Sequence, residues 1–301
     1  MAGSLVLGGE AMVTPPARTG PSASFLAAAR TALVRYLHTA HPQIALVRPG
    51  GPATGPAAPA APAAPTAPAA PSRGAGKLAK TAATAHTSSY NWSGYADVSG
   101  TTGTFTEVSG QWQTPGVRCS REDEIVSNWV GLDGFADSTV EQDGTVGWCF
   151  EDTPTYFTWY EMAPAGTVEV GKAVRAGDRI TARVLREGTR FKLSLTDANH
   201  PANGFSVTRT CSLSACKVTS AEWICERPAY PTTGIAPLAR YTPWKLLDAT
   251  ETARGVTGTI SSFSPSYRIA MNDSTNSYGL SAPSVIGGGG TMFSTRWRDS
   301  Y

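Results

Sequence analysis

The chain has 301 residues, enough for one large β domain or two ordinary domains, and its formal net charge is +2 at pH 7. The charge is unevenly distributed, because seven Lys and Arg residues but only one acidic residue, Glu10, precede residue 88. This predicts a basic arm joined to an acidic body. Nucleic-acid binding is disfavoured, because the basic residues of the arm are scattered rather than clustered. A membrane span is excluded by length, because no run of 18 apolar residues occurs.

The first 88 residues are predicted to be a leader or propeptide-like arm that is disordered or weakly helical. Residues 24–47 carry apolar side chains at roughly helical spacing, which is typical of a marginal amphipathic helix. The Pro and Ala repeats of residues 51–76 favour an extended, semi-rigid polyproline spacer. Residues 1–23 lack the basic start and apolar core of a signal peptide, so this end of the chain does not indicate export.

Residues 89–301 show mostly strand and turn patterns, which predicts a single all-β domain. Two alternating runs joined by Glu187-Gly188-Thr189 have the spacing of a β-hairpin. Many short strands punctuated by Gly and Asn favour an antiparallel sandwich or barrel. The candidate strands are 90–98, 105–113, 125–132, 156–162, 179–186, 190–197, 219–226, 268–272 and 291–297.

All five cysteines lie in the body, and the absence of a C-x-x-C pair or a nearby His argues against zinc. Cys211 and Cys216 have the spacing of a disulfide across a hairpin, and Cys119 with Cys149 is a second candidate pair. Cys225 would then remain as a small buried thiol. Paired cysteines imply an oxidising compartment.

The common catalytic motifs of hydrolases do not occur in the body. There is no G-x-S-x-G, no H-E-x-x-H and no Asp-Thr-Gly or Asp-Ser-Gly, and no glycine-rich phosphate loop. His200 lies in a turn-like segment and is expected to be a solvated loop residue rather than a base. Chemistry based on carboxylates remains.

Two polar side chains, Gln142 and Glu226, lie in strand-like segments among aromatic and β-branched residues, where a polar group is rare unless it is needed. A carboxylate can take a proton from water, and an amide can donate to an oxyanion. Glu222 would share a strand face with Glu226, which makes it a rival for the carboxylate role. Glu161 and Asp133 are further candidates.

Five motifs, in this order, resemble those of the glutamic peptidases (eqolisins). They are Tyr90-Asn91-Trp92-Ser93-Gly94-Tyr95, Trp129-Val130-Gly131-Leu132-Asp133-Gly134, the Gln142 segment, Trp159-Tyr160-Glu161 followed by Pro164, and Glu222-Trp223-Ile224 with Glu226. The resemblance implies an antiparallel β-sandwich of two curved sheets, of the concanavalin-like or jelly-roll type. Met162-Ala163 and Arg227-Pro228 depart from the fungal pattern, which indicates a bacterial-type member with different substrate preferences.

The resemblance also implies roles for particular residues. The catalytic pair falls on Gln142 and Glu226, and the substrate-binding or supporting positions fall on Trp92, Trp129, Asp133, Trp159, Glu161 and Glu222. Glu226 would act as general base and then acid, and the Gln142 amide would stabilise the oxyanion. We therefore expect a secreted, monomeric endopeptidase that acts on proteins or peptides, with an acidic optimum and no metal or other cofactor.

Two other functions fit parts of the pattern. A glycoside hydrolase on a similar sandwich also uses paired carboxylates in a Trp-lined cleft, although it has no evident use for Gln142. A carbohydrate-binding module without catalytic activity could use exposed Trp side chains to stack on sugars. Casein hydrolysis, compared with release of reducing sugar, would separate the three functions.

Overall fold

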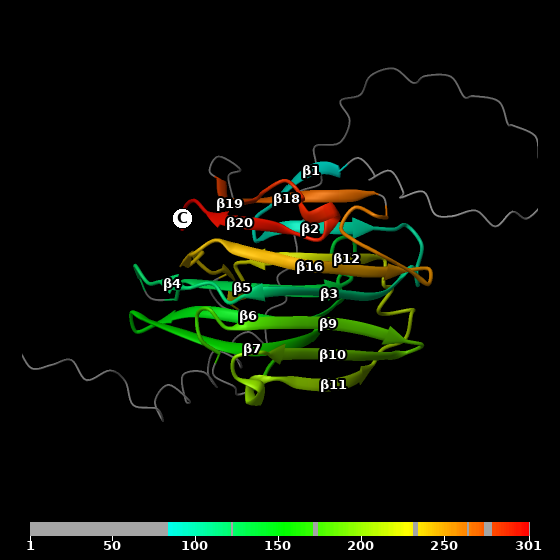
Figure 1. Ribbon diagram of the computed structural model, residues 1–301, viewed down its shortest axis with the longest axis horizontal. Coiled ribbons are helices and arrows are strands. Elements are labelled where there is room, and N and C mark those ends of the chain that lie inside the picture. Colours follow the sequence, from blue (N-terminus) through cyan, green and yellow to red (C-terminus); the bar gives the residue numbers. More distant parts are fainter. Residues whose placement is uncertain are drawn as a thin grey trace, which may run out of the picture.

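A β-sandwich makes up the part of the chain that the structure describes (Figure 1). The computed structural model describes residues 84–121, 123–170, 174–230, 234–263, 265–273 and 279–300. Its regular elements are strands and two 3-10 turns, η1 (Pro201–Asn203) and η2 (Gly288–Gly290). No helix within these ranges has the length and apolar character needed to cross a membrane. The strands are β1 (Thr84–Ser89), β2 (Trp92–Val98), β3 (Phe105–Gln113), β4 (Val117–Arg118), β5 (Ile125–Leu132), β6 (Val140–Phe150), β7 (Thr153–Ala163), β8 (Ala165–Glu169), β9 (Arg179–Glu187), β10 (Arg190–Asp197), β11 (Phe205–Thr210), β12 (Ser220–Glu226), β13 (Ala229–Tyr230), β14 (Gly234–Ile235), β15 (Arg240–Tyr241), β16 (Trp244–Ala253), β17 (Val256–Gly258), β18 (Ser266–Asn272), β19 (Gly279–Pro283) and β20 (Phe293–Trp297).

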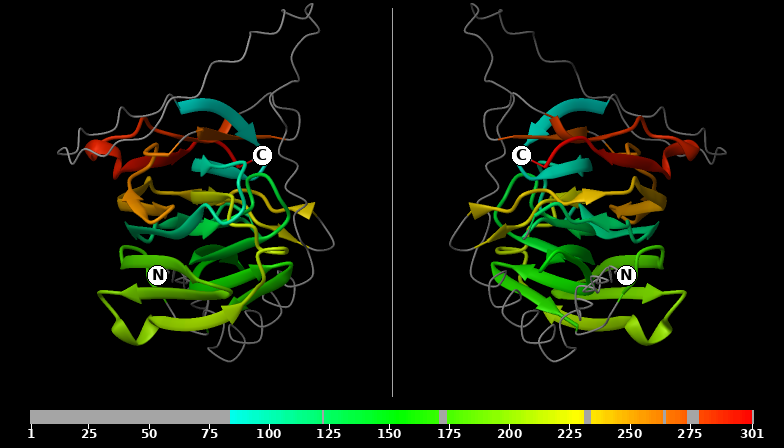
Figure 2. Two further views of the ribbon diagram at one scale, coloured as in Figure 1. Left: turned by 90° about the vertical axis from the view of Figure 1, so that its right-hand side faces the viewer. Right: turned by 90° about the vertical axis from the view of Figure 1, so that its left-hand side faces the viewer.

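One long sheet folds over on itself to form both layers of the sandwich (Figures 1 and 2). Its hydrogen-bonded order is β11-β10-β9-β3-β16-β20-β19-β18-β2-β12-β5-β6-β7-β8. One layer consists of β11, β10, β9, β3 and β16, and the other consists of β2, β12, β5, β6 and β7. Strands β20, β19 and β18 join the two layers. Every pairing along this path is antiparallel. The expected antiparallel sandwich is therefore confirmed.

Apolar side chains fill the space between the two layers. Because successive side chains of a strand point to opposite faces, β9 and β10 bury alternate residues such as Val184 and Leu193 and expose the residues between them. Strand β12 is buried at every position, so both of its faces are covered. The indole of Trp223 points from β12 toward the other layer and donates to the carbonyl oxygen of Ser109 on β3 at 2.8 Å. Glu226, on the opposite face of β12, therefore points away from the other layer.

Two long strands were not among the candidate strands. Strand β6 contains Gly144 and Gly147, and glycines are a turn signal when only the sequence is known. Strand β16 contains an irregularity between Leu247 and Thr250, where Asp248 has a φ of 49°, and this interrupts its alternation. By contrast, the predicted strands 105–113, 125–132 and 190–197 have the bounds of β3, β5 and β10.

The body of the protein begins before the predicted boundary at residue 89. Strand β1 starts at Thr84 and pairs in parallel with β18, with Thr84 opposite Ser266 and Ser89 opposite Met271. The helix expected in residues 24–47 and the spacer expected in residues 51–76 lie outside the described residues. The leader-like character of the arm stays a prediction.

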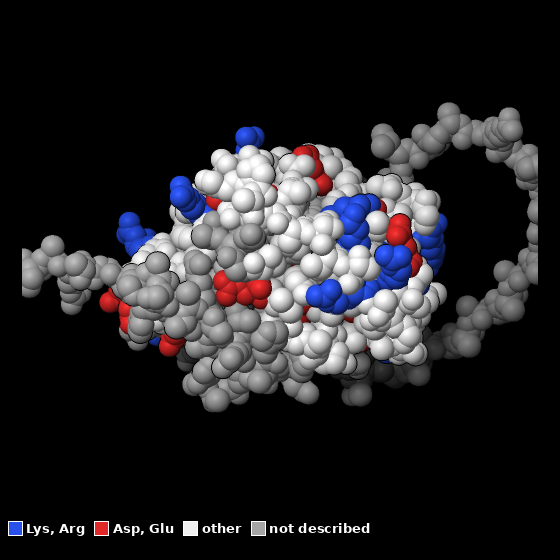
Figure 3. Space-filling model, turned by 90° about the horizontal axis from the view of Figure 1, so that it is seen from below, with Lys and Arg blue, Asp and Glu red and all other residues white. Residues whose placement is uncertain are grey.

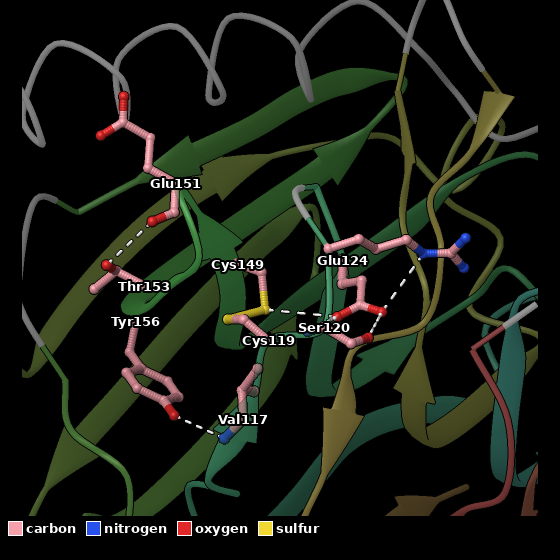
Figure 4. Close-up of a disulfide and its surroundings, with 9 residues drawn as sticks. Val117, Cys119, Ser120, Glu124, Cys149, Glu151, Thr153 and Tyr156 are labelled. Atoms are coloured by element: carbon pink, nitrogen blue, oxygen red, sulfur yellow. Dashed lines mark hydrogen bonds and ion pairs between the residues drawn. A yellow bond between two sulfur atoms is a disulfide. The ribbon is translucent and has the colours of Figure 1, made fainter.

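Both predicted disulfides are present, Cys119–Cys149 and Cys211–Cys216, and Cys225 is a buried free thiol. Figure 4 shows the first disulfide beside the carboxylate of Glu124. The backbone N–H and the hydroxyl of Ser120 donate to this carboxylate at 2.9 and 2.6 Å. The disulfide ties the segment before β5 to the end of β6, and the two hydrogen bonds hold that segment in its turn.

We expect the two disulfides to contribute unequally to stability. Their partners are 30 and 5 residues apart, and the loop-closure model assigns about 4 and about 2 kcal/mol to such loops. Urea denaturation of Cys119→Ala/Cys149→Ala and of Cys211→Ala/Cys216→Ala measures both contributions. Equal losses, or a larger loss from opening the short loop, would contradict this assignment.

Candidate active site

One face of the layer formed by β2, β12, β5, β6 and β7 carries most of the predicted site residues. Directly paired residues of neighbouring strands share a face, as do residues two positions apart on one strand. Trp92 pairs with Glu226, and Gln142 pairs with Glu161. Strand β5 lies between β12 and β6, with Ser127 opposite Glu226 and Gly131 opposite Gln142. Ser127 and Gly131 are an even number of residues apart, so all four side chains lie on the face turned away from the other layer.

Aromatic side chains cover this face and form a second apolar cluster, separate from the core between the layers. Trp92 and Trp129 meet edge to face, with their ring centroids 5.0 Å apart. The fully buried members of the cluster include Phe157 and Ile224. The predicted residue Trp159 also belongs to it, and its indole N–H has no partner among the described residues. The polar site residues therefore lie in a largely apolar environment.

Two glycines make room for Trp129. A Cβ atom on Gly144 would lie 2.2 Å from the carbonyl oxygen of Asn128 and 2.7 Å from the Cβ of Trp129. A Cβ atom on Gly131 would lie 2.9 Å from the Trp129 ring. Gly144 thus allows the backbone of β6 to lie close to Trp129, and Gly131 leaves room on β5 for the indole, which reaches toward β12.

Two N–H donors hold the carboxyl group of Glu226. The indole Nε1 of Trp129 donates to Oε2 at 2.8 Å, and the amide Nδ2 of Asn91 donates to Oε1 at 3.0 Å. Burial raises the pKa of Glu226 to about 7, and the hydrogen bonds from Trp129 and Asn91 oppose this rise. Each carboxylate oxygen keeps a lone pair for a further partner. The group can therefore accept a proton near neutral pH.

Glu161 holds the amide of Gln142. Gln142 donates from Nε2 to Glu161 Oε2 at 3.0 Å, and the hydroxyl of Thr167 donates to the same oxygen at 3.2 Å. The Oε1 atom of Gln142 has no partner among the described residues. Burial, followed by the nearby charge of Glu226, raises the pKa of Glu161 to about 8. Below this pH Glu161 is neutral.

The two candidate carboxylates on β12, Glu226 and Glu222, differ in their solvent exposure. Glu226 and Gln142 keep 7% and 6% of their surface exposed, whereas Glu222 has none. Burial raises the pKa of Glu222 well above its ordinary value, so this residue stays a neutral acid. A group that solvent does not reach cannot activate a water, so the structure favours Glu226 over Glu222 for the carboxylate role.

Asp133 lies apart from the pair and anchors the segment before β12. Its carboxylate accepts hydrogen bonds from the backbone N–H groups of Val218 and Thr219 at 2.5 and 2.7 Å. Burial, together with the neighbouring Asp137, raises its pKa to about 6. These contacts fit a supporting role in which Asp133 fixes the start of the strand that carries Glu226.

Sequence reasoning did not assign a role to Asn91 or Thr167, although Asn91 lies in a motif that it singled out. Each donates to a carboxyl group of the site. Asn91 lies 135 positions from its partner Glu226, so spacing could not reveal the contact. The Asn-Trp pair in the opening strand was the one signal available.

The described residues contain one group with the composition of a metal site, Asp178, Asp197 and His200, and it includes none of the residues above. His200 adjoins η1, as expected for a loop residue, and its Nδ1 lies 3.2 Å from Asp178 Oδ2. Backbone N–H groups already donate to both carboxylates, to Asp178 from Arg175 and to Asp197 from His200. These bonds are typical of a turn.

Comparison with known proteins identifies the family and the fold. The family model described as the Peptidase A4 family matches residues 90–285. The fold is similar to that of scytalido-glutamic peptidase with a transition state analog inhibitor, at 21% identity over 69% of this chain and 98% of that chain, with a TM-score of 0.59. It is also similar to SCP-B, a member of the eqolisin family of peptidases in complex with the tripeptide Ala-Ile-His, at 20% identity over 69% and 98%, with a TM-score of 0.56. Curated protein sequences give no match.

The buried carboxyl groups predict a fold that is most stable in acid. Burial raises the pKa of Asp133, Glu226 and Glu161 to about 6, 7 and 8, above their unfolded values, so the folded protein binds more protons. Their contribution is complete below about pH 4, where the unfolded carboxyl groups are also protonated, and it is lost as the pH rises from there to about 8, where the last of the three groups ionises in the folded protein. The pKa of Asp197 is lowered, so its ionised carboxylate stabilises the fold, and this contribution is lost only in strong acid.

Urea denaturation between pH 4 and pH 9 measures this dependence. The free energy of unfolding should fall above about pH 4 and level off near pH 8, and Glu161→Gln should make the fall between the pKa values of Glu226 and Glu161, about 7 and about 8, shallower. A free energy of unfolding that rises from pH 5 to pH 8 would be incompatible with neutral buried carboxyl groups.

Proposed function

The chain belongs to the Peptidase A4 family and is a glutamic endopeptidase, and on this premise we propose that it cleaves peptide bonds with a Glu226–Gln142 dyad. The observation that carries the proposal is that these two side chains share one sheet face and retain some exposure. Each is held by a partner, Glu226 by Trp129 and Gln142 by Glu161. Family membership displaces the glycosidase and carbohydrate-binding alternatives.

In the proposed reaction Glu226 acts first as a general base. Its carboxylate takes a proton from a water molecule, whose oxygen attacks the carbonyl carbon of the scissile peptide bond. The protonated Glu226 then gives this proton to the leaving amine, which restores the carboxylate. The donors Trp129 and Asn91 stabilise the ionised form in which the cycle begins and ends.

Gln142 would stabilise the oxyanion of the tetrahedral intermediate. Its amide group has two N–H donors, and the contact with Glu161 uses one of them. The second can donate to the developing negative charge. Glu161 supports this role while it is neutral, because a negative charge at this position would repel the oxyanion.

The pH range of activity follows from these two carboxyl groups. The raised pKa of Glu226, about 7, makes it a stronger base than a free glutamate, but it also reduces its ionised fraction in acid. The loss of the Glu161 proton, whose pKa is about 8, limits activity at higher pH. These two values limit activity near pH 7 on the acid side and near pH 8 on the alkaline side, so they do not support the acidic optimum expected from a free glutamate, which stays a prediction.

The aromatic face is the proposed binding surface for the peptide substrate. Trp92, Trp129 and Trp159 lie beside the dyad, and Trp159 has a buried N–H donor without a described partner. Such a donor suits a peptide carbonyl group. The similar SCP-B structure holds a tripeptide, which supports a peptide as the ligand of this chain.

Export from the cell and a monomeric state are also part of the proposal. Two disulfides form within the described body, and disulfides persist in oxidising compartments. The site residues named above all come from one chain, so the site does not require a second copy.

We also propose that the basic arm before β1 is a leader that inhibits the enzyme, although attraction between a basic arm and an acidic body does not explain such inhibition. Eleven acidic residues of the described body are buried, against one basic residue, Arg227. The surface therefore carries more basic than acidic side chains, and Figure 3 shows Lys and Arg side chains gathered at one end of one face. Inhibition by a basic arm would have to rest on other contacts, such as occupation of the aromatic face.

Replacement of either dyad residue should abolish most activity. Removal of an oxyanion donor costs about 10² to 10³ in turnover, so Gln142→Ala should lose that much. Glu226→Gln should lose at least as much, because an amide cannot accept the proton. Casein hydrolysis measures the activity of both variants. The controls are Gln111→Ala and Glu187→Gln, which change exposed residues of the other layer. Substantial activity in Glu226→Gln would overturn the assignment.

Removal of the arm tests the leader proposal. A protein that begins at Lys80 keeps all of β1, and it should fold and be more active than the full chain if the arm inhibits. Specific activity toward casein and the rate of conversion of the full chain in acid are the measurements. Equal specific activity of the two forms from the first time point would exclude inhibition by the arm.

A further inference from the structure

Ser89, the last residue of β1, forms three hydrogen bonds within the next three residues. Its Oγ accepts from the backbone N–H groups of Asn91 and Trp92 at 3.3 and 3.1 Å. Its hydroxyl donates to Oδ1 of the Asn91 side chain at 3.0 Å. Ser89 and Asn91 are both buried, with 1% and 3% of their surface exposed.

These bonds determine which end of the Asn91 amide faces Glu226. A serine hydroxyl has two acceptor lone pairs and one proton, and the two backbone N–H groups occupy both lone pairs of Ser89. Ser89 can then only donate to the side chain of Asn91, so it must face the amide oxygen. The amide nitrogen therefore faces Glu226, to whose Oε1 it donates at 3.0 Å.

We infer that Ser89 and Asn91 are positioning residues for the general base, an inference that rests on the proposed function. The Ser89 hydroxyl orients the Asn91 amide, and this amide holds Oε1 of Glu226 as a hydrogen-bond acceptor. Trp129, which can only donate, holds Oε2 in the same way. Glu226 thus has one fixed donor on each oxygen, which favours its ionised form and fixes the direction of its free lone pairs.

The same contacts connect the N-terminal strand to the site. The Asn91 carbonyl oxygen accepts from the backbone N–H of Arg227 at 3.0 Å, and the Tyr90 carbonyl oxygen accepts from Arg227 Nε at 2.7 Å. Strand β1 is itself fixed by its pairing with β18. Removal of the whole of β1 would therefore also remove Ser89, the residue that orients the Asn91 amide.

The inference predicts a change in the pH profile and not only in stability. Loss of a donor to the ionised form raises the pKa of Glu226, so the acid limb of kcat/KM should move to higher pH, by about one pH unit for Asn91→Ala. The value of kcat should fall about tenfold, as expected for one hydrogen bond to a charged group, while KM changes little. Ser89→Ala should shift the limb in the same direction by less.

The test compares pH profiles and thermal unfolding of these two variants with Ser89→Thr, Ser88→Ala and Glu226→Gln. Ser89→Thr keeps the hydroxyl and should therefore have the pH profile of the unchanged protein. Ser88→Ala is the matched control, because Ser88 points to the other face of β1, and it should leave the profile unchanged. Lower melting temperatures without a shift of the acid limb would overturn the inference and leave the dyad intact. An active Glu226→Gln would instead overturn the proposed function itself.

Discussion

The burial of one carboxyl group, that of Glu226, is the constraint on which the rest of the site depends. An ionised carboxylate in an apolar environment is strongly unfavourable unless N–H groups donate to it. Trp129 and Asn91 supply one donor to each oxygen. Trp129 can do so because Gly131 leaves space for its indole. The glycine, the indole and the carboxyl group therefore act as one unit, and a change in any of them affects the others.

The folding-over of one sheet explains how such a unit forms. Strand β12 lies in the middle of its layer, with the other layer behind it and the aromatic face in front, so both faces of the strand are buried. A carboxyl group on this strand loses most of its contact with water. Its proton affinity rises into the range in which proton transfer with water is effective. The same burial affects the fold, so stability and catalysis respond to pH in an overlapping range.

Much of the architecture could be predicted because it depends on local pattern. Alternation of apolar and polar residues predicted β9 and β10, and cysteine spacing predicted Cys211–Cys216. Only the segment around Gln142 was recognised as strand-like, and the full strand β6 was not predicted, because a glycine such as Gly144, which lies against Trp129, is indistinguishable in sequence from a turn glycine. Here a residue's role depends on a neighbouring strand, which the local pattern does not contain.

The sequence by itself determined the class of fold, the order of the motifs and the identity of the polar residues, because strand periodicity and unusual polar positions are properties of short segments. Only the tertiary structure decided which of these residues meet. It brought Asn91 to Glu226 across 135 positions, gave Glu226 the exposure that Glu222 lacks, and joined β1 to the site through Ser89. Hydrogen bonds and burial depend on distance in space, and that distance is set when the sheet folds over on itself.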